Sequence, residues 1–256
     1  MTPRWLLVIA VASAACRAPD HSAQSAPPAR DSAASPPRPT RDLAAATVTR
    51  RLGRDSCPGD SATGAWATTD SGLAAERREF AAAPHAVSRS GRDLLVELAD
   101  GGVARLRDCY SDGDLYISYR YAGFLQALAT HLIDVGYYEG HAILLLGDRH
   151  WGAYRTYGLP VLSPDSAHFA TSAIDVESTE DPNSLEVWRV AADTLVREFD
   201  IEPDGQEWGP SSPRWVSPTV LEFWRVLGQQ SDSAGDSSKA YLVQRGGTWS
   251  LETTAP

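Results

Sequence analysis

Three of the six histidines of this chain lie in one stretch with acidic residues, and imidazole beside carboxylate is a common pair for general acid–base chemistry. The stretch contains His131, Glu139, His141, Asp148 and His150. The last four fall at the turns of predicted hairpins, where they could act as the acid and base of a hydrolase or hold a metal ion. Polar residues at turn tips are also typical of the solvated cap of a sheet, and this interpretation is the stronger one. The sequence therefore assigns no catalytic residue.

A second group of oxygen-bearing side chains lies further along the chain. It comprises Asp175, Glu177, Glu180, Asp181 and Asn183. Carboxylate and amide oxygens at close spacing suit Ca²⁺, which makes Asp175, Glu177 and Asp181 candidate ligands. The EF-hand spacing is absent and Pro182 interrupts the run, so a charged loop between two strands is the better interpretation. We predict no metal site and no cofactor.

Complete catalytic motifs are missing from the sequence. It contains no G-x-S-x-G, no H-E-x-x-H and no C-x-x-C, and its only lysine, Lys239, lies outside any glycine-rich loop, which excludes a Walker A motif. Carboxylate pairs leave no local motif, so a hydrolase remains an alternative. The absence of these motifs favours a protein that is not an enzyme.

Aromatic residues give the clearest indication of a binding surface. Eight of the nine tyrosines lie between Tyr110 and Tyr157. Alternation in the segment 115–121 predicts that Tyr119 and Tyr121 share one strand face, whereas Tyr116 and Arg120 share the other. Tyrosine, tryptophan and arginine are enriched in protein-binding hot spots, and aromatic faces also suit sugars. The candidate binding residues are Tyr116, Arg120, Tyr137, Tyr138 and Trp151, although tyrosines also fill the faces of β-sheets.

The elements that must position these residues are predicted to be strands. One helix is expected over 72–83, before Pro84, and roughly a dozen short strands follow it. Hairpins are predicted around Asp100-Gly101-Gly102 and around Glu139-Gly140-His141, because glycine supplies the positive φ of a tight turn. The fold class is therefore all-β, as an antiparallel meander.

Two segments of the chain repeat at an offset of 53 residues, each with an apolar strand after a proline-containing turn. The first begins at Pro160 and contains Ser163-Pro164-Asp165, and the second begins at Pro213 and contains Trp215. Over about 100 residues this pattern resembles the TolB/WD40-like propeller repeat, which implies four strands per blade and a surface that recognises partners. A small or incomplete β-propeller is expected, with a β-sandwich or barrel, or two small β domains, as alternatives.

The N-terminus has the layout of a secretory signal, with one arginine before an eight-residue apolar core at 5–12. The Ser13-Ala14-Ala15-Cys16 sequence that follows resembles a bacterial lipoprotein signal. The resemblance implies lipidation of Cys16 and an anchor in the cell envelope, with the outer membrane or its periplasmic face as the destination. Cleavage after Ala14 would instead give a soluble secreted protein.

The number of cysteines and the local composition predict how the rest of the chain is divided. The chain has three cysteines, so a lipidated Cys16 leaves Cys57 and Cys109 as a disulfide pair in an oxidising compartment. Residues 17–46, rich in alanine, proline and serine, are predicted to be a disordered tether. We expect an N-terminal β segment over 47–110, stapled by the disulfide, and a β-repeat domain over 111–256.

The overall charge narrows the choice of partner. The 256 residues carry a formal net charge of −10, which disfavours a nucleic-acid ligand because phosphate neutralisation needs clustered cations. An acidic domain is also repelled by an anionic membrane surface. The leading hypothesis is a membrane-tethered, non-enzymatic module that presents a β surface to an envelope protein or glycan. The alternatives are the envelope hydrolase and a purely structural lipoprotein.

Overall fold

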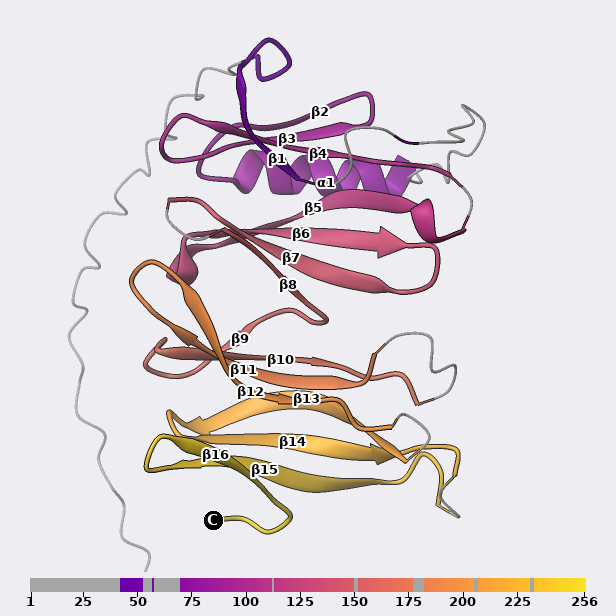
Figure 1. The fold of residues 1–256 in the computed structure, drawn as a ribbon, viewed down its shortest axis with the longest axis vertical. Helices are drawn as coiled ribbons and strands as arrows, with labels where there is room; N and C mark the ends of the chain where they lie inside the picture. The colour runs from indigo at the N-terminus through magenta and orange to yellow at the C-terminus, as the bar shows by residue number, and fades with distance from the viewer. Residues whose placement is uncertain are drawn as a thin grey trace, which may run out of the picture. The chain divides into compact units, whose positions relative to one another are not determined.

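The computed structural model describes residues 42–52, 57, 70–111, 113–149, 152–176, 182–204, 207–230 and 233–256. Within these residues the fold is all-β, with sixteen strands in four four-stranded sheets and one α-helix (Figure 1). The predicted signal peptide and the tether up to residue 41 lie outside the described residues. The same holds for His150, Trp151, Glu177 and Asp181.

The first sheet contains the N-terminal strands and lies beside the helix. Its strands are β1 (Val48–Leu52), β2 (Val87–Ser90), β3 (Asp93–Glu97) and β4 (Val103–Arg107), in the order β1-β4-β3-β2. The predicted hairpin around Gly101 joins β3 to β4, and β1 pairs with β4 in parallel. Helix α1 (Asp70–Ala82) ends two residues before Pro84, because the position before a proline disfavours helical backbone.

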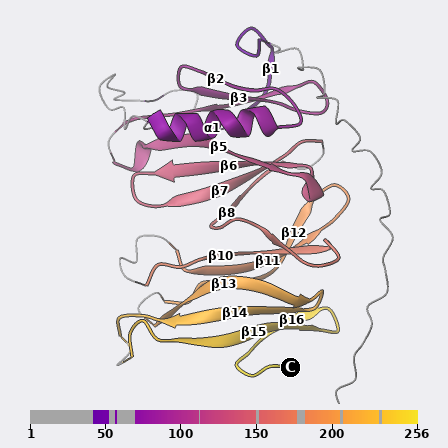
Figure 2. The same cartoon turned by 180° about the vertical axis from the view of Figure 1, so that it is seen from behind.

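The other three sheets are antiparallel meanders in chain order (Figures 1 and 2). The second sheet consists of β5 (Ile117–Leu125), β6 (Thr130–Tyr137), β7 (His141–Gly147) and β8 (Ala153–Thr156). The third consists of β9 (Val161–Leu162), β10 (His168–Ala173), β11 (Ser184–Val190) and β12 (Leu195–Ile201). The fourth consists of β13 (Trp208–Ser217), β14 (Val220–Leu227), β15 (Ser237–Arg245) and β16 (Thr248–Glu252). The two repeating segments of the sequence thus lie in the third and fourth sheets.

Hydrophobic cores between successive sheets hold this arrangement together. The second sheet lies between two of these cores. In β7, Leu144 and Leu146 pack into the core shared with the first sheet. Ile143 and Leu145, on the opposite face, pack into the core shared with the third sheet. A sheet covered on both faces needs apolar residues at every position rather than alternation. The third and fourth sheets share a core built around Trp215.

The strand pairing excludes one predicted alternative. Each sheet of the described chain pairs only within itself and none closes, so the β-barrel is ruled out. The physical reason is that each sheet buries at least one face against a neighbouring sheet instead of curling onto itself. Leu43, in the segment predicted as tether, is buried against Leu95 and Val103 of the first sheet.

The predicted disulfide between Cys57 and Cys109 is present and links positions 52 residues apart. Cys109 also forms an antiparallel bridge with Ile117, the first residue of β5. The covalent link is thereby attached to the segment that carries the chain from the first sheet into the second.

Candidate functional site

Strand β5 lies at one edge of the second sheet, and side chains cover its backbone there. The N–H of Tyr119 donates to Oδ1 of Asp108 at 2.8 Å, and the N–H of Tyr121 donates to Oε1 of Glu76 at 2.9 Å. The carbonyl of Tyr119 accepts a hydrogen bond from Arg89. Two carboxylates and a guanidinium therefore stand where a neighbouring strand would pair, which closes this edge to further strand addition.

The charged groups on this edge form one buried network. Arg89 of β2 donates to Glu76 at 2.8 and 3.2 Å and to Asp108 at 3.0 Å, and the side chains of both acids are no more than 3 % exposed. Burial by itself lowers the pKa of Arg89, but Glu76 and Asp108 raise that pKa above its ordinary value. Burial raises the pKa of Asp108, an effect that Tyr110 and Arg89 only partly offset. The network positions β5 against the first sheet.

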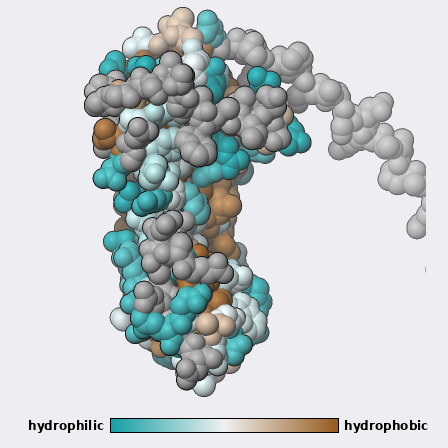
Figure 3. Space-filling model, turned by 90° about the vertical axis from the view of Figure 1, so that its right-hand side faces the viewer, coloured by the Kyte–Doolittle hydropathy of each residue, from teal (hydrophilic) through white to brown (hydrophobic). Residues whose placement is uncertain are grey.

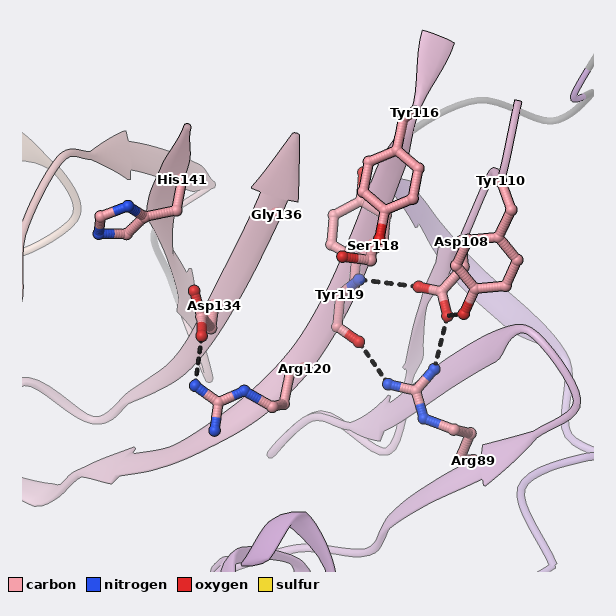
Figure 4. Close-up of a pocket in the computed structure, with 10 residues that line it drawn as sticks. All are labelled: Arg89, Asp108, Tyr110, Tyr116, Ser118, Tyr119, Arg120, Asp134, Gly136 and His141. Carbon is pink, nitrogen blue, oxygen red and sulfur yellow. Dashed lines mark hydrogen bonds and ion pairs between the residues drawn. The ribbon is translucent and has the colours of Figure 1, made fainter. Parts of the chain in front are cut away.

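A cavity of about 320 Å³ opens beside this network, and we call it the β5-edge pocket (Figure 4). Its lining residues are Arg89, Asp108, Tyr110, Tyr116, Ser118, Tyr119, Arg120, Asp134, Gly136 and His141. The volume falls within the range of small-ligand sites, about 300–1,000 Å³. Tyr116 and Arg120, which the sequence placed on one binding face, both contribute to this pocket.

Two pairs of side chains give the pocket its chemical character. The rings of Tyr110 and Tyr116 lie 6.0 Å apart between centroids and form a half-buried aromatic wall. Arg120 of β5 is ion-paired with Asp134, its cross-strand neighbour on β6 (Figure 4). Burial and the hydrogen bond to Asp108, at 2.7 Å, raise the pKa of Tyr110, so this phenol stays protonated. The pocket thus combines aromatic surface with adjacent donors and acceptors.

Gly136 lines the pocket between β5 and β6, and its lack of a side chain leaves space there. Gly136 faces Ser118 across the two strands, and a Cβ at Gly136 would lie 2.7 Å from Oγ of Ser118. The φ of Gly136 is not in the left-handed region, so its backbone does not require glycine. Space beside the Ser118 hydroxyl is therefore what favours glycine here.

A second cavity, of about 470 Å³, adjoins the first on the side of the third sheet, and we call it the adjoining pocket. It shares Arg120, Asp134 and His141 with the β5-edge pocket. Its other lining residues are Ala122, Ile143, Tyr157, Gly158, Leu159, Ser172, Ala173 and Ile174. Most of these are apolar or small, so the two cavities form a polar half and an apolar half on either side of one ion pair.

Hydrophobic side chains also reach the surface in this part of the molecule. Figure 3 shows one face, on which hydrophobic surface gathers about halfway along the series of sheets. Of the exposed large hydrophobic residues, Leu159 and Ile174 belong to the adjoining pocket, with 57 % and 40 % of their surface exposed. The apolar half of the double cavity is thus open to solvent.

The structure separates Tyr137 and Tyr138, two of the other predicted binding residues, from the pocket. Tyr138 lies in the turn between β6 and β7 with 63 % of its surface exposed, and it lines neither cavity. Tyr137 is half-buried, and its hydrogen bond raises the pKa of Arg155. Trp151 falls outside the described residues. Within β5 the predicted alternation holds, since Tyr119 and Tyr121 are buried whereas Arg120 is exposed.

Of the four catalytic candidates, the three that the structure describes do not form one cluster. His141 begins β7 and lines both cavities, whereas Asp148 follows the other end of the same strand and is buried. Glu139 lies exposed in the turn before β7, and His150 is outside the described residues. Successive turns of a meander lie at opposite ends of its strands, which is why residues close in sequence are far apart here.

Asp148 belongs instead to a buried hydrogen-bond chain. Its carboxylate contacts Nε2 of His131 at 3.3 Å and Nε2 of His85 at 3.2 Å, and it accepts the N–H of Ala99 at 2.9 Å. Nδ1 of His131 meets the hydroxyl of Tyr121 at 3.0 Å. Burial lowers the pKa of His131, against the opposing effect of Asp148. These residues line neither cavity, and they join the first and second sheets.

The calcium candidates are only partly covered by the structure. Asp175 is half-buried, and its backbone N–H and carbonyl bond the side chain of Asn183 at 2.9 and 2.7 Å. Glu177 and Asp181 lie outside the described residues. Among the residues that the structure does describe, no group of three or more histidine, cysteine or acidic side chains is placed to hold a metal ion.

Most of the residues that complete the site have no local signal in the sequence. Arg89, Asp108, Ser118, Asp134 and Gly136 lie on four strands or strand ends, and only the fold brings them together. One signal was available: Asp108 and Tyr110 flank Cys109, and the predicted disulfide already fixed that segment near the sheet.

Comparisons with protein-family models, curated proteins and solved structures find no match to this chain. Among the described residues, no helix has the length and apolar character needed to cross a membrane.

Proposed function

We propose that this protein is a membrane-tethered, non-enzymatic binding module of the bacterial cell envelope, and that the β5-edge pocket receives its protein or glycan partner. The observation that carries the proposal is the convergence of Tyr110, Tyr116, Arg120 and Asp134 around one open cavity. An aromatic wall next to a few convergent polar groups is the usual composition of a ligand site.

The hydrogen bonds that the charged groups already make favour binding over catalysis. Asp108 accepts hydrogen bonds from Arg89, Tyr110 and the N–H of Tyr119, so its oxygens are already engaged. A general base needs a lone pair directed at a substrate proton. The hydrolase alternative also needed His141 beside Asp148, and β7 separates these two residues.

The tethered location is supported by the sequence pattern at the N-terminus. A lipid on Cys16 would hold the protein at the membrane, and the proline-rich segment after it would act as an extended spacer. The acidic net charge of −10 would keep the sheets away from anionic lipid and leave the pocket facing other envelope components.

An affinity pull-down from native membranes tests this function. The full chain, with its signal and a C-terminal tag, is compared with Tyr116→Ala and Arg120→Ala variants. Arg214→Ala is the matched control, because Arg214 is also an exposed arginine that forms a cross-strand ion pair, with Glu222 on the fourth sheet. We expect one stoichiometric partner that both pocket variants lose and the control retains. Capture that is absent, or unchanged in all variants, would contradict the proposal and favour a structural lipoprotein.

A further inference from the structure

We propose that the β5-edge pocket binds an uncharged saccharide, an inference that rests on the proposed function and names its class of partner. The formally charged residues lining the pocket are two arginines and two aspartates. Arg120 is paired with Asp134, and Arg89 is paired with Asp108 and also with Glu76, which does not line the pocket, so both cations of the lining already have carboxylate partners. A phosphate or carboxylate group would therefore find no cation in the lining that lacks a carboxylate partner, and nothing there would offset its desolvation. An uncharged polar ligand has no such cost.

The exposed ion pair matches the hydrogen bonding of hydroxyl groups. Arg120 presents N–H donors and Asp134 presents carboxylate acceptors side by side, with 48 % and 25 % of their side chains exposed. A hydroxyl group both donates and accepts, so neighbouring ring hydroxyls can satisfy the two side chains together. The hydroxyls of Ser118 and Tyr116 add further partners of the same kind.

The aromatic wall provides the apolar complement that a sugar ring needs. A saccharide has hydroxyl edges and faces of C–H groups, and tyrosine likewise combines an apolar ring with a polar tip. Tyr110 and Tyr116 stand next to each other on one side of the pocket, at 6.0 Å between centroids. A ring packed on this wall would direct its hydroxyls toward Arg120 and Asp134.

Two other classes of ligand fit the pocket less well. A peptide that adds as a strand to β5 would need free backbone groups, but Asp108 and Glu76 already take the N–H groups of Tyr119 and Tyr121. An acyl chain would bury apolar surface against charged and hydroxyl groups, leaving them without water. The observations therefore favour the glycan over the protein partner.

The adjoining pocket extends the site toward a second sugar residue. It meets the first pocket at Arg120, Asp134 and His141, and its far wall includes Leu159 and Ile174. A neighbouring residue of the same saccharide can pack its C–H face or an apolar substituent there. We therefore expect oligosaccharides to bind more tightly than the corresponding monosaccharides.

The test uses a variant that fills part of the pocket and leaves every charged residue unchanged. The Gly136→Val variant places a side chain where Ser118 already leaves only 2.7 Å, while valine suits a strand well. Gly152→Val is the control, because a Cβ at Gly152 meets nothing within 4 Å and that residue lines neither cavity. Full-length proteins in detergent micelles are applied to an array of neutral and acidic oligosaccharides, with equal melting temperatures as the check on folding.

The expected result is binding to neutral oligosaccharides that falls at least about tenfold in Gly136→Val and stays unchanged in Gly152→Val. If Gly136→Val does not fold, Ser118→Ala takes its place, since it removes a lining hydroxyl without adding volume. Preference for acidic saccharides, equal binding by variant and control, or no binding to any saccharide would overturn the proposal.

The pull-down separates this proposal from the function on which it rests. Pocket-dependent capture that survives proteinase and is abolished by periodate, which cleaves vicinal diols, supports a glycan. Capture that proteinase abolishes and periodate spares overturns the saccharide but leaves the binding module standing. No pocket-dependent capture at all overturns both.

Discussion

Arg89 shows how much can depend on a single residue, because it is the cation between two nearly buried carboxylates. Replacing Arg89 with methionine would leave Glu76 and Asp108 without their positive partner, and we expect unfolding to become easier by about 3–5 kcal/mol. The measurement is urea denaturation at neutral pH. Arg120→Met is the control and should cost no more than about 1 kcal/mol, because exposed ion pairs contribute little. Equal losses in the two variants would refute a structural role for the Arg89 network.

His131 is the residue through which stability should depend on pH. Burial lowers its pKa in the folded protein from 6.5, so the unfolded chain takes up a proton first as the pH falls. The free energy of unfolding should therefore decrease below about pH 6.5, by at most about 1.4 kcal/mol per pH unit. His85, Asp148 and Tyr121 surround this imidazole. Urea denaturation across this range should give a shallower slope for His131→Gln, and identical slopes would contradict the assignment.

Among the structural elements, β5 begins next to the disulfide. Cys109 is bonded to Cys57 and pairs through its backbone with the first residue of β5. Closing a loop of this length contributes about 4 kcal/mol in the chain-entropy model. We expect a reducing agent to lower the melting temperature of the wild type and to leave a Cys57→Ser/Cys109→Ser variant unaffected. A wild-type melting temperature that does not respond to complete reduction would show that the link adds no stability.

The elements also show what the sequence could and could not predict. The β3–β4 and β6–β7 hairpins and helix α1 follow from local signals, namely glycine turns, apolar runs and a proline stop. Alternation correctly places Tyr119 and Tyr121 inside, because it reports the face of a strand. It does not show which side chains cover the edge of a strand, and therefore it gives no sign of Arg89 or Asp108. It also does not show that His141 and Asp148 occupy opposite ends of β7.

At the scale of the whole molecule, the distribution of charge differs between the chain and its pocket. The chain carries −10, whereas the charged residues lining the β5-edge pocket cancel. The negative charge therefore lies elsewhere, where it can oppose contact with an anionic membrane. If Cys16 carries the proposed lipid, the protein would stay close to the membrane through this anchor alone, and its pocket would remain available to envelope glycans.

The anchor is the last property to test, because it decides where the pocket can act. In bacteria, the full chain should acquire lipid on Cys16 and sediment with membranes, whereas Cys16→Ala should remain in the soluble fraction. One acyl chain gives only marginal membrane binding, so stable sedimentation requires the multiple chains of a lipoprotein anchor. Mass spectrometry of the mature N-terminus provides the measurement. A mature chain that begins at Ala15, without lipid, would show instead that the protein is secreted as a soluble module.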